Sequence, residues 1–187
     1  MRPRSVVPAA LCAVLALTAC TPDNAPAGAA AADQPLPELQ VPASAAGGAC
    51  ILLDYPQIEE HIGVRFDVAA SDQSGETATC VVQTEGSTRP DLTLVVVEST
   101  TADARTYLAE LKPKGAKSLS GLGAAAYRQV LPAEDGAGPA VELGWLTKDK
   151  QLLSLRFTFG DGAGEQEAND MAGRLVNLAQ ALDSDEL

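Results

Sequence analysis

The residues with the most distinctive chemistry in this chain are its four cysteines, Cys12, Cys20, Cys50 and Cys80. A cysteine thiolate can act as a nucleophile, bind a metal ion or form a disulfide. Cys50 and Cys80 do not form a C-x-x-C motif, and one pair of thiols cannot complete a four-ligand zinc site. In an oxidising compartment this pair predicts one intramolecular disulfide, which would close a loop of about 30 residues and stabilise the fold by roughly 3–4 kcal/mol. The alternative is two buried or redox-active thiols.

Cys20 follows a segment that is typical of an export signal. Two arginines precede a twelve-residue apolar run, residues 6–17, which is shorter than the roughly 20 residues that cross a bilayer as a helix. The run ends in Leu17-Thr18-Ala19-Cys20, which resembles the bacterial lipobox: an aliphatic residue, two small residues and a cysteine that accepts a diacylglyceryl group. An ordinary secretory signal with a chance cysteine is the alternative.

The lipobox predicts how the chain is divided. We expect a lipoprotein signal peptide over residues 1–19, the lipidated Cys20 and a disordered linker over 20–48, and one extracytoplasmic domain over 49–187. The linker is rich in Ala and Pro and has too few large apolar residues to offset the entropy of ordering it. The alternative is a structured element that packs residues 36–41 on the domain.

Several acyl chains would hold the protein on the outer face of the cell membrane, because each buried CH₂ contributes roughly 0.8 kcal/mol.

Candidate catalytic groups are few. His61 is the single histidine, which excludes nearly every histidine-based catalytic or zinc site. It follows Glu59 and Glu60, so an acid–base pair is conceivable, but a solvated helix face is the favoured interpretation. The motifs H-E-x-x-H, G-x-S-x-G and G-x-x-x-x-G-K-[ST] are absent, and Gly121-x-Gly123 precedes a predicted strand, which is the wrong geometry for a dinucleotide fingerprint. We expect no catalytic residue, metal site, cofactor or enzymatic activity.

The charge and aromatic content exclude further classes of function. Lys and Arg number 13 against 25 Asp and Glu, so the net charge of −12 disfavours nucleic-acid binding. Aromatic residues make up 4% of the chain, which leaves no evident stacking platform for bases or sugars. The single tryptophan, Trp145, is expected in the core, with a pocket-lining position as the alternative.

Two local clusters of charge each permit a binding interpretation. The basic cluster Lys112, Lys114 and Lys117 follows a predicted helix, where it would complement the helix dipole; an anion or a lipid headgroup is the alternative partner. An acidic cluster surrounds the start of the last predicted helix, where the dipole also explains it better than calcium does, because the EF-hand order is missing. Its members are Asp161, Glu165, Glu167 and Asp170.

The elements that would position these residues follow from periodicity and turn signals. Helices are predicted over residues 54–63, from a Thr100 cap to Pro113, and over 164–182. Strands are predicted over residues 64–70, 78–84, 92–98, 125–131, 141–147 and 151–159. The order α-β-β-β-α-β-β-β-α with short connections predicts an α+β domain with an antiparallel sheet of five to six strands packed against helices, and it hints at an internal duplication.

Several short motifs carry a family resemblance over residues 49–182. They are Cys50-Ile51-Leu52-Leu53-Asp54 before a helix, Cys80, the loop from Gly121 to Tyr127, and K-x-x-x-L-L-S-L in the last hairpin. In these the chain resembles a family of actinobacterial exported lipoproteins known as a domain of unknown function. It is more distantly similar to the extracellular sensor domain of mycobacterial receptor kinases. The resemblance implies a disulfide and an envelope location, and no established activity.

The function expected from the sequence is non-catalytic binding at the cell surface. The domain would bind an envelope protein or a small ligand, with no nucleic-acid partner. A structural or accessory lipoprotein acting through protein contacts is the first alternative, and an enzyme with scattered side chains is the second. An apolar pocket of a few hundred Å³ would favour a ligand, and a flat patch would favour the first alternative. A cleft with paired carboxylates of shifted pKa would favour the second.

Overall fold

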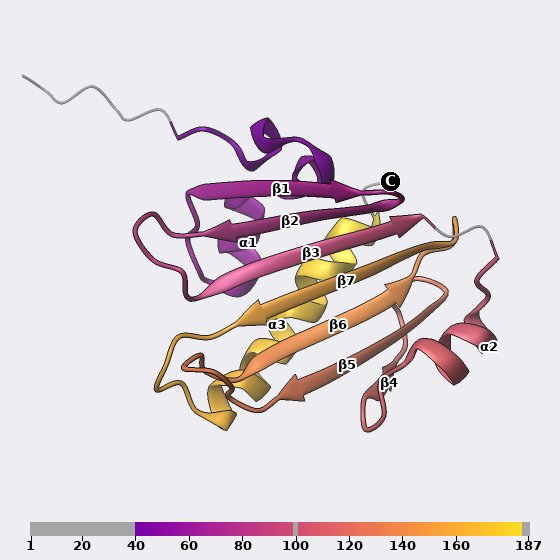
Figure 1. Ribbon diagram of the computed structural model, residues 1–187. Helices are drawn as coiled ribbons and strands as arrows, with labels where there is room; N and C mark the ends of the chain where they lie inside the picture. The colour runs from indigo at the N-terminus through magenta and orange to yellow at the C-terminus, as the bar shows by residue number, and fades with distance from the viewer. Residues whose placement is uncertain (1–39, 99–100, 185–187) are drawn as a thin grey trace, which may run out of the picture. The chain divides into compact units, whose positions relative to one another are not determined.

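The computed structural model describes residues 40–98 and 101–184, which form an open, seven-stranded antiparallel sheet with helices (Figure 1). The predicted signal peptide, Cys20 and most of the predicted linker lie outside the described residues. The strand order is β1-β2-β3-β7-β6-β5-β4. The strands are β1 (Val68–Ser74), β2 (Thr77–Gln83), β3 (Asp91–Glu98), β4 (Lys117–Leu119), β5 (Ala125–Leu131), β6 (Ala140–Leu146) and β7 (Gln151–Thr158).

The helical segments are three α-helices, two 3₁₀ turns and one π turn within the described ranges. They are η1 (Ala43–Ala46), η2 (Gly48–Leu52), α1 (Tyr55–Ile62), α2 (Ala104–Thr106), the π turn η3 (Tyr107–Leu111) and α3 (Glu165–Ser184). No helix in the described part of the chain combines the length and the hydropathy that a membrane span requires. The antiparallel sheet and the three α-helices confirm the predicted α+β class.

The number of strands differs from the five to six predicted, because β4 is a seventh strand in the sheet order. It consists of Lys117, Ser118 and Leu119, paired with Arg128, Tyr127 and Ala126 of β5. Three residues are too few to show the alternation of polar and apolar side chains by which a strand is predicted.

The first strand begins later than predicted. Residues 71–74 continue β1, and the turn consists of Gly75 and Glu76. Gly75 has a φ of 59°, the left-handed backbone conformation that two-residue hairpin turns require. β1 is an edge strand with an almost entirely exposed surface, so its polar residues Asp72 and Gln73 incur no burial cost. The prediction was wrong here because it followed β-branched residues, which an exposed edge does not need.

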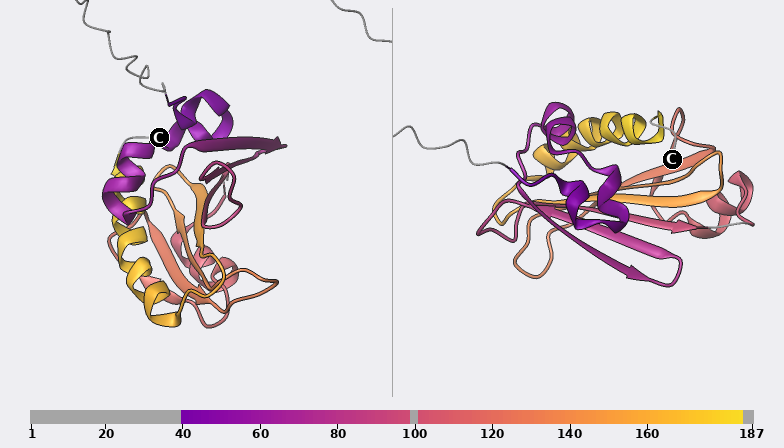
Figure 2. Two further views of the ribbon diagram at one scale, coloured as in Figure 1. Left: turned by 90° about the vertical axis from the view of Figure 1, so that its left-hand side faces the viewer. Right: turned by 90° about the horizontal axis from the view of Figure 1, so that it is seen from above.

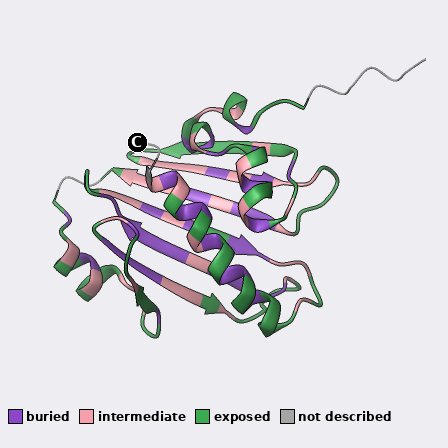
Figure 3. Cartoon of the chain, turned by 180° about the vertical axis from the view of Figure 1, so that it is seen from behind, coloured by how far each residue is buried: buried purple, intermediate pink, exposed green. Residues whose placement is uncertain are grey.

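One face of the sheet carries the main core, under α1 and α3 (Figures 2 and 3). Alternate residues of the central strands point into it, because successive side chains of a strand face opposite sides. The buried side of α3 contributes Leu175, Leu178 and Ala179, all at 0% exposure, which agrees with the helical periodicity predicted over residues 164–182. Trp145 is fully buried in this core, so its predicted core position is also confirmed.

The second helix differs from the prediction in its cap and its register. Asp103 caps it, accepting a hydrogen bond at Oδ1 from the backbone N of Thr106 at 2.8 Å; this bond lowers the pKa of Asp103. Thr100 lies outside the described residues. Only one turn is α-helical before the π turn, in which Lys112 N donates to Tyr107 O at 3.0 Å. Leu111, the last residue of this π turn, is 47% exposed.

The two halves of the sheet, β1–β3 and β4–β7, meet at the antiparallel pair of β3 and β7. The helices do not repeat this arrangement. α1 packs with α3 on the main core face, whereas Tyr107 of η3 packs with Tyr127 and Leu146 on the opposite face. The helices are thus placed differently on the two halves of the sheet, and the internal duplication stays a prediction.

Candidate functional site

An apolar pocket of about 790 Å³ lies where η2 and the start of α1 meet β2, β3 and the end of α3. The apolar side chains that line it come from five separate elements or connections. They are Ala49, Ile51, Leu52, Leu53, Ala78, Val96 and Leu182. Ile51 is 65% exposed, a large apolar side chain left at the edge of an opening. No sequence pattern indicates this pocket, because its walls come from segments that are far apart in the chain.

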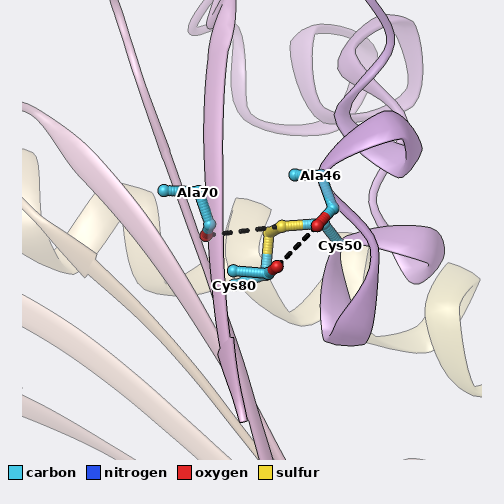
Figure 4. The surroundings of a disulfide bond; sticks show 5 residues. Ala46, Cys50, Ala70 and Cys80 are labelled. Atoms are coloured by element: carbon cyan, nitrogen blue, oxygen red, sulfur yellow. Dashed lines mark hydrogen bonds between the residues drawn. A yellow bond between two sulfur atoms is a disulfide. The ribbon is translucent and has the colours of Figure 1, made fainter.

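The wall formed by η2 is held in place by the predicted disulfide, which is present between Cys50 and Cys80 (Figure 4). Cys50 lies in η2 and Cys80 in β2, their Cα atoms are 4.9 Å apart, and both residues are fully buried. Cys50 is adjacent to Ala49 and Ile51, and Cys80 lies two residues from Ala78, so the crosslink joins two walls of the pocket. This chemistry is structural, because a bridged cysteine has no thiol to react.

A second contact holds the same segment against β1. Ser71 Oγ of β1 donates a hydrogen bond at 2.6 Å to the backbone O of Ala46, the last residue of η1. The Cys50 Sγ atom lies 3.5 Å from Ala70 O at the sheet edge. The chain is already folded in this region: Ala43 is 1% exposed and packs in the core. Residues Ala43–Ala46, which lie inside the predicted linker, form the 3₁₀ turn η1.

The polar groups of the pocket are Asp54, Gln57 and Gln151. Asp54 is the N-cap of α1 as predicted, and its Oδ2 accepts a hydrogen bond from Gln57 N at 3.3 Å. Pro56 lies in the first turn, and Gly63 ends the helix with a φ of 73°. The pocket is thus an apolar cavity with a few groups at its wall that can orient the polar end of a ligand.

The other candidate residues lie outside this pocket. His61 is half-buried in the last turn of α1, and Glu59 and Glu60 are exposed beside it. In the acidic cluster, Glu167 Oε2 accepts a hydrogen bond from Gly164 N at 2.8 Å, which is a helix-capping role. Within residues 40–98 and 101–184 no three His, Cys, Asp or Glu residues are grouped as a metal site would require.

The glycine loop before β5 joins the sheet to α3. Gly123 N donates to Asp183 Oδ2 at 3.1 Å, and Gln180 Nε2 donates to Gly121 O at 3.0 Å. A Cβ atom at Gly123 would lie 2.2 Å from Leu146 O, so only glycine fits this close approach. These contacts favour a structural role for the loop over dinucleotide binding.

A tyrosine cluster on the opposite face of the sheet was not predicted. The rings of Tyr107 and Tyr127 are stacked with centroids 6.1 Å apart, and Tyr127 Oη donates to Glu142 Oε1 at 3.0 Å. Burial is the main cause that raises the pKa of both phenols, and the negative charge of Glu142 adds to it. Both hydroxyls stay protonated, and the ring stacking together with the hydrogen bond from Tyr127 to Glu142 attaches η3 to the sheet rather than supplying a nucleophile.

Comparisons with known proteins do not place the chain in a family. No protein-family model matches it, and no curated protein matches it. A solved crystal structure from Bacteroides thetaiotaomicron is similar over 56% of this chain and 40% of its own, with 15% sequence identity and a TM-score of 0.33. The chain thus spans less than half of that protein, and a likeness of this size carries no argument about function.

Proposed function

We propose that this protein is a membrane-anchored surface lipoprotein whose domain binds a small apolar or amphipathic molecule from the cell envelope without catalysing a reaction. The observation that carries the proposal is the apolar pocket of about 790 Å³, which is within the size range of small-molecule sites. A disulfide that joins two of its walls supports a preformed site, since a rigid wall lowers the entropy cost of binding.

The chemistry of the lining indicates the class of ligand. Its apolar side chains favour a hydrocarbon or ring portion, and its few polar groups lie around Asp54 and Gln57 at the start of α1. A hydroxyl or amide on the ligand could donate to the carboxylate of Asp54. The lining has no Ser, Thr, Cys, His or Lys side chain, which supports binding rather than covalent chemistry.

A charge introduced at the pocket edge tests the binding site. Ile51→Glu is expected to weaken binding of the neutral fluorescent probe N-phenyl-1-naphthylamine at least tenfold, about 1.4 kcal/mol, because a carboxylate would replace apolar surface. Probe fluorescence would be titrated with the chain from Thr21 onward, which contains every described residue. Leu111→Glu is the matched control: Leu111 is 47% exposed against 65% for Ile51, but it does not line the pocket. Equal affinities of the two variants would contradict the proposed site.

The anchor has its own test. Cys20→Ser is expected to move the protein from the membrane fraction to the soluble fraction of the producing bacterium, because no acyl chain can then be attached. The measurement is immunoblotting of fractionated cells, with mass spectrometry of the N-terminal peptide as confirmation. Retention of the Cys20→Ser protein in the membrane fraction, or an unmodified Cys20 in the native protein, would contradict lipid anchoring.

A further inference from the structure

We propose a second binding site, in the cavity of about 590 Å³ between β4, β5 and the first turns of α3, which takes a phosphate group carried either by a lipid headgroup or by a soluble phosphate ester. Three cations line this cavity: Lys114, Lys117 and Arg128. The site is independent of the apolar pocket, with which it shares no lining residue.

The pairing of β4 with β5 brings two of these cations side by side. Lys117 and Arg128 are directly opposed in the antiparallel register. The next pair on the same face, Leu119 and Ala126, packs in the core with α3, so the alternation of a strand directs Lys117 and Arg128 to the α3 side as well. Like charges at opposed positions destabilise a strand pair. An anion bound between them would replace this repulsion with two attractions.

None of these three cations forms an ion pair within 4.0 Å with another described residue. Across residues 40–98 and 101–184 the single ion pair within 4.0 Å joins Arg89 and Asp91. Lys112 has a structural role instead, because its Nζ donates to Ala116 O at 3.0 Å and holds the turn before β4. The predicted basic cluster is thus divided. Lys112 is bound to the backbone, while Lys114 and Lys117 line the cavity together with Arg128, eleven residues after Lys117.

The charge of this cavity stands out against the charge of the whole chain. Its three cations and one carboxylate, Glu165, leave a local charge of 3 − 1 = +2, whereas the chain as a whole carries −12. Charge lining a concave surface concentrates ions of the opposite sign. On an acidic protein, a local excess of positive charge is a specific feature rather than a consequence of composition.

The residue types favour phosphate among anions. A guanidinium can donate two parallel hydrogen bonds to a phosphate, while lysines act as point charges beside it. The cavity is larger than one phosphate ion, and its remaining polar lining includes the side chain of Asn169. The bound molecule is therefore a phosphate ester with a hydroxylated remainder, of which glycerol phosphate is the simplest example. This group occurs both as a free solute and as the headgroup of phosphatidylglycerol.

The test uses the chain from Thr21 onward, so that no acyl chain contributes to membrane binding. Calorimetric titration with inorganic phosphate and with glycerol 1-phosphate should show saturable binding at one site, weaker at high ionic strength. Arg128→Gln and Lys117→Gln should each lower the affinity at least tenfold, whereas Glu165→Gln should raise it. Lys148→Gln is the control, because Lys148 is an exposed cation outside the cavity. Thermal unfolding of each variant should show a folded protein, since the Gln substitutions remove a repulsion.

Flotation with vesicles distinguishes the two sources of phosphate. Binding to phosphatidylglycerol-containing vesicles but not to pure phosphatidylcholine, lost in Arg128→Gln, would support a lipid headgroup. Binding of the soluble ester without flotation would support a free phosphate ester. Ile51→Glu should leave both unchanged, which separates this result from the apolar pocket. The proposal is overturned by a chain that binds none of these molecules, or by binding that Arg128→Gln and Lys117→Gln leave intact.

Discussion

Alanine substitution of both Cys50 and Cys80 is expected to lower the free energy of unfolding by roughly 3–4 kcal/mol and to abolish binding of the neutral probe in the apolar pocket. The bridge closes a loop with a sequence separation of 30, so its loss frees the unfolded chain and favours unfolding. A typical domain has only about 5–15 kcal/mol of stability, so this loss is a large fraction of the total. Binding is lost because η2 is no longer fixed to β2.

Urea unfolding of the wild type, with and without reductant, and of the double variant would measure the first effect. Ser71→Ala is the control, since it removes only the exposed hydrogen bond to Ala46 O and should cost about 0.5–1.5 kcal/mol. Probe titration at a urea concentration where the double variant is still folded would measure the second effect. If the midpoints of the oxidised wild type and the double variant coincide, the stabilising role is wrong. If binding survives the loss of the bridge, η2 keeps its position without it.

The parts of this fold that could be predicted from sequence are those in which one segment carries its own signal. The twenty-residue helix α3 repeats its apolar stripe over several turns, and Asp54 and Gly63 mark the two ends of α1 by capping chemistry alone. Cys12 belongs to the predicted signal peptide and Cys20 to the lipobox, so Cys50 and Cys80 were the pair left to form a disulfide. For the two helices the physical cause lies within a few neighbouring residues, whereas the disulfide follows from elimination of the other cysteines.

The two proposed binding sites and the tyrosine cluster depend on how the strands pair, so local sequence signals could not predict them. Lys117 and Arg128 become neighbours only because the three-residue strand β4 pairs with β5. A strand this short has no periodic pattern by which it could be predicted. The walls of the apolar pocket belong to segments as distant as Ala49 and Leu182. Tyr127 was visible as a strand residue, but nothing in the sequence indicates that Glu142 accepts its hydroxyl hydrogen bond. These contacts are set by pairing across the sheet, which is a property of the whole fold.

Gly144→Ala is expected to destabilise the domain by about 3 kcal/mol, at the upper end of the usual cost of overpacking. Gly144 is directly opposed to Tyr127 on β5, and an added Cβ would lie 2.4 Å from Tyr127 Cε1 and 2.8 Å from Tyr107 Oη. Neither ring can easily move away, because the two are stacked on each other and Tyr127 Oη is bound to Glu142. The methyl group must therefore displace a buried ring or separate β5 from β6.

Chemical unfolding followed by circular dichroism would measure this loss, and the near-ultraviolet signal of the tyrosines would report the displaced rings. Gly173→Ala is the matched control, because its Cβ would meet nothing within 4 Å on α3 and should stabilise the helix by about 1 kcal/mol. Combining Gly144→Ala with Tyr127→Ala should cost less than the sum of the two single effects, since the small ring-free side chain leaves room for the methyl group. Strict additivity of the two substitutions, or an unchanged midpoint for Gly144→Ala, would show that the ring over the glycine does not constrain this strand pair.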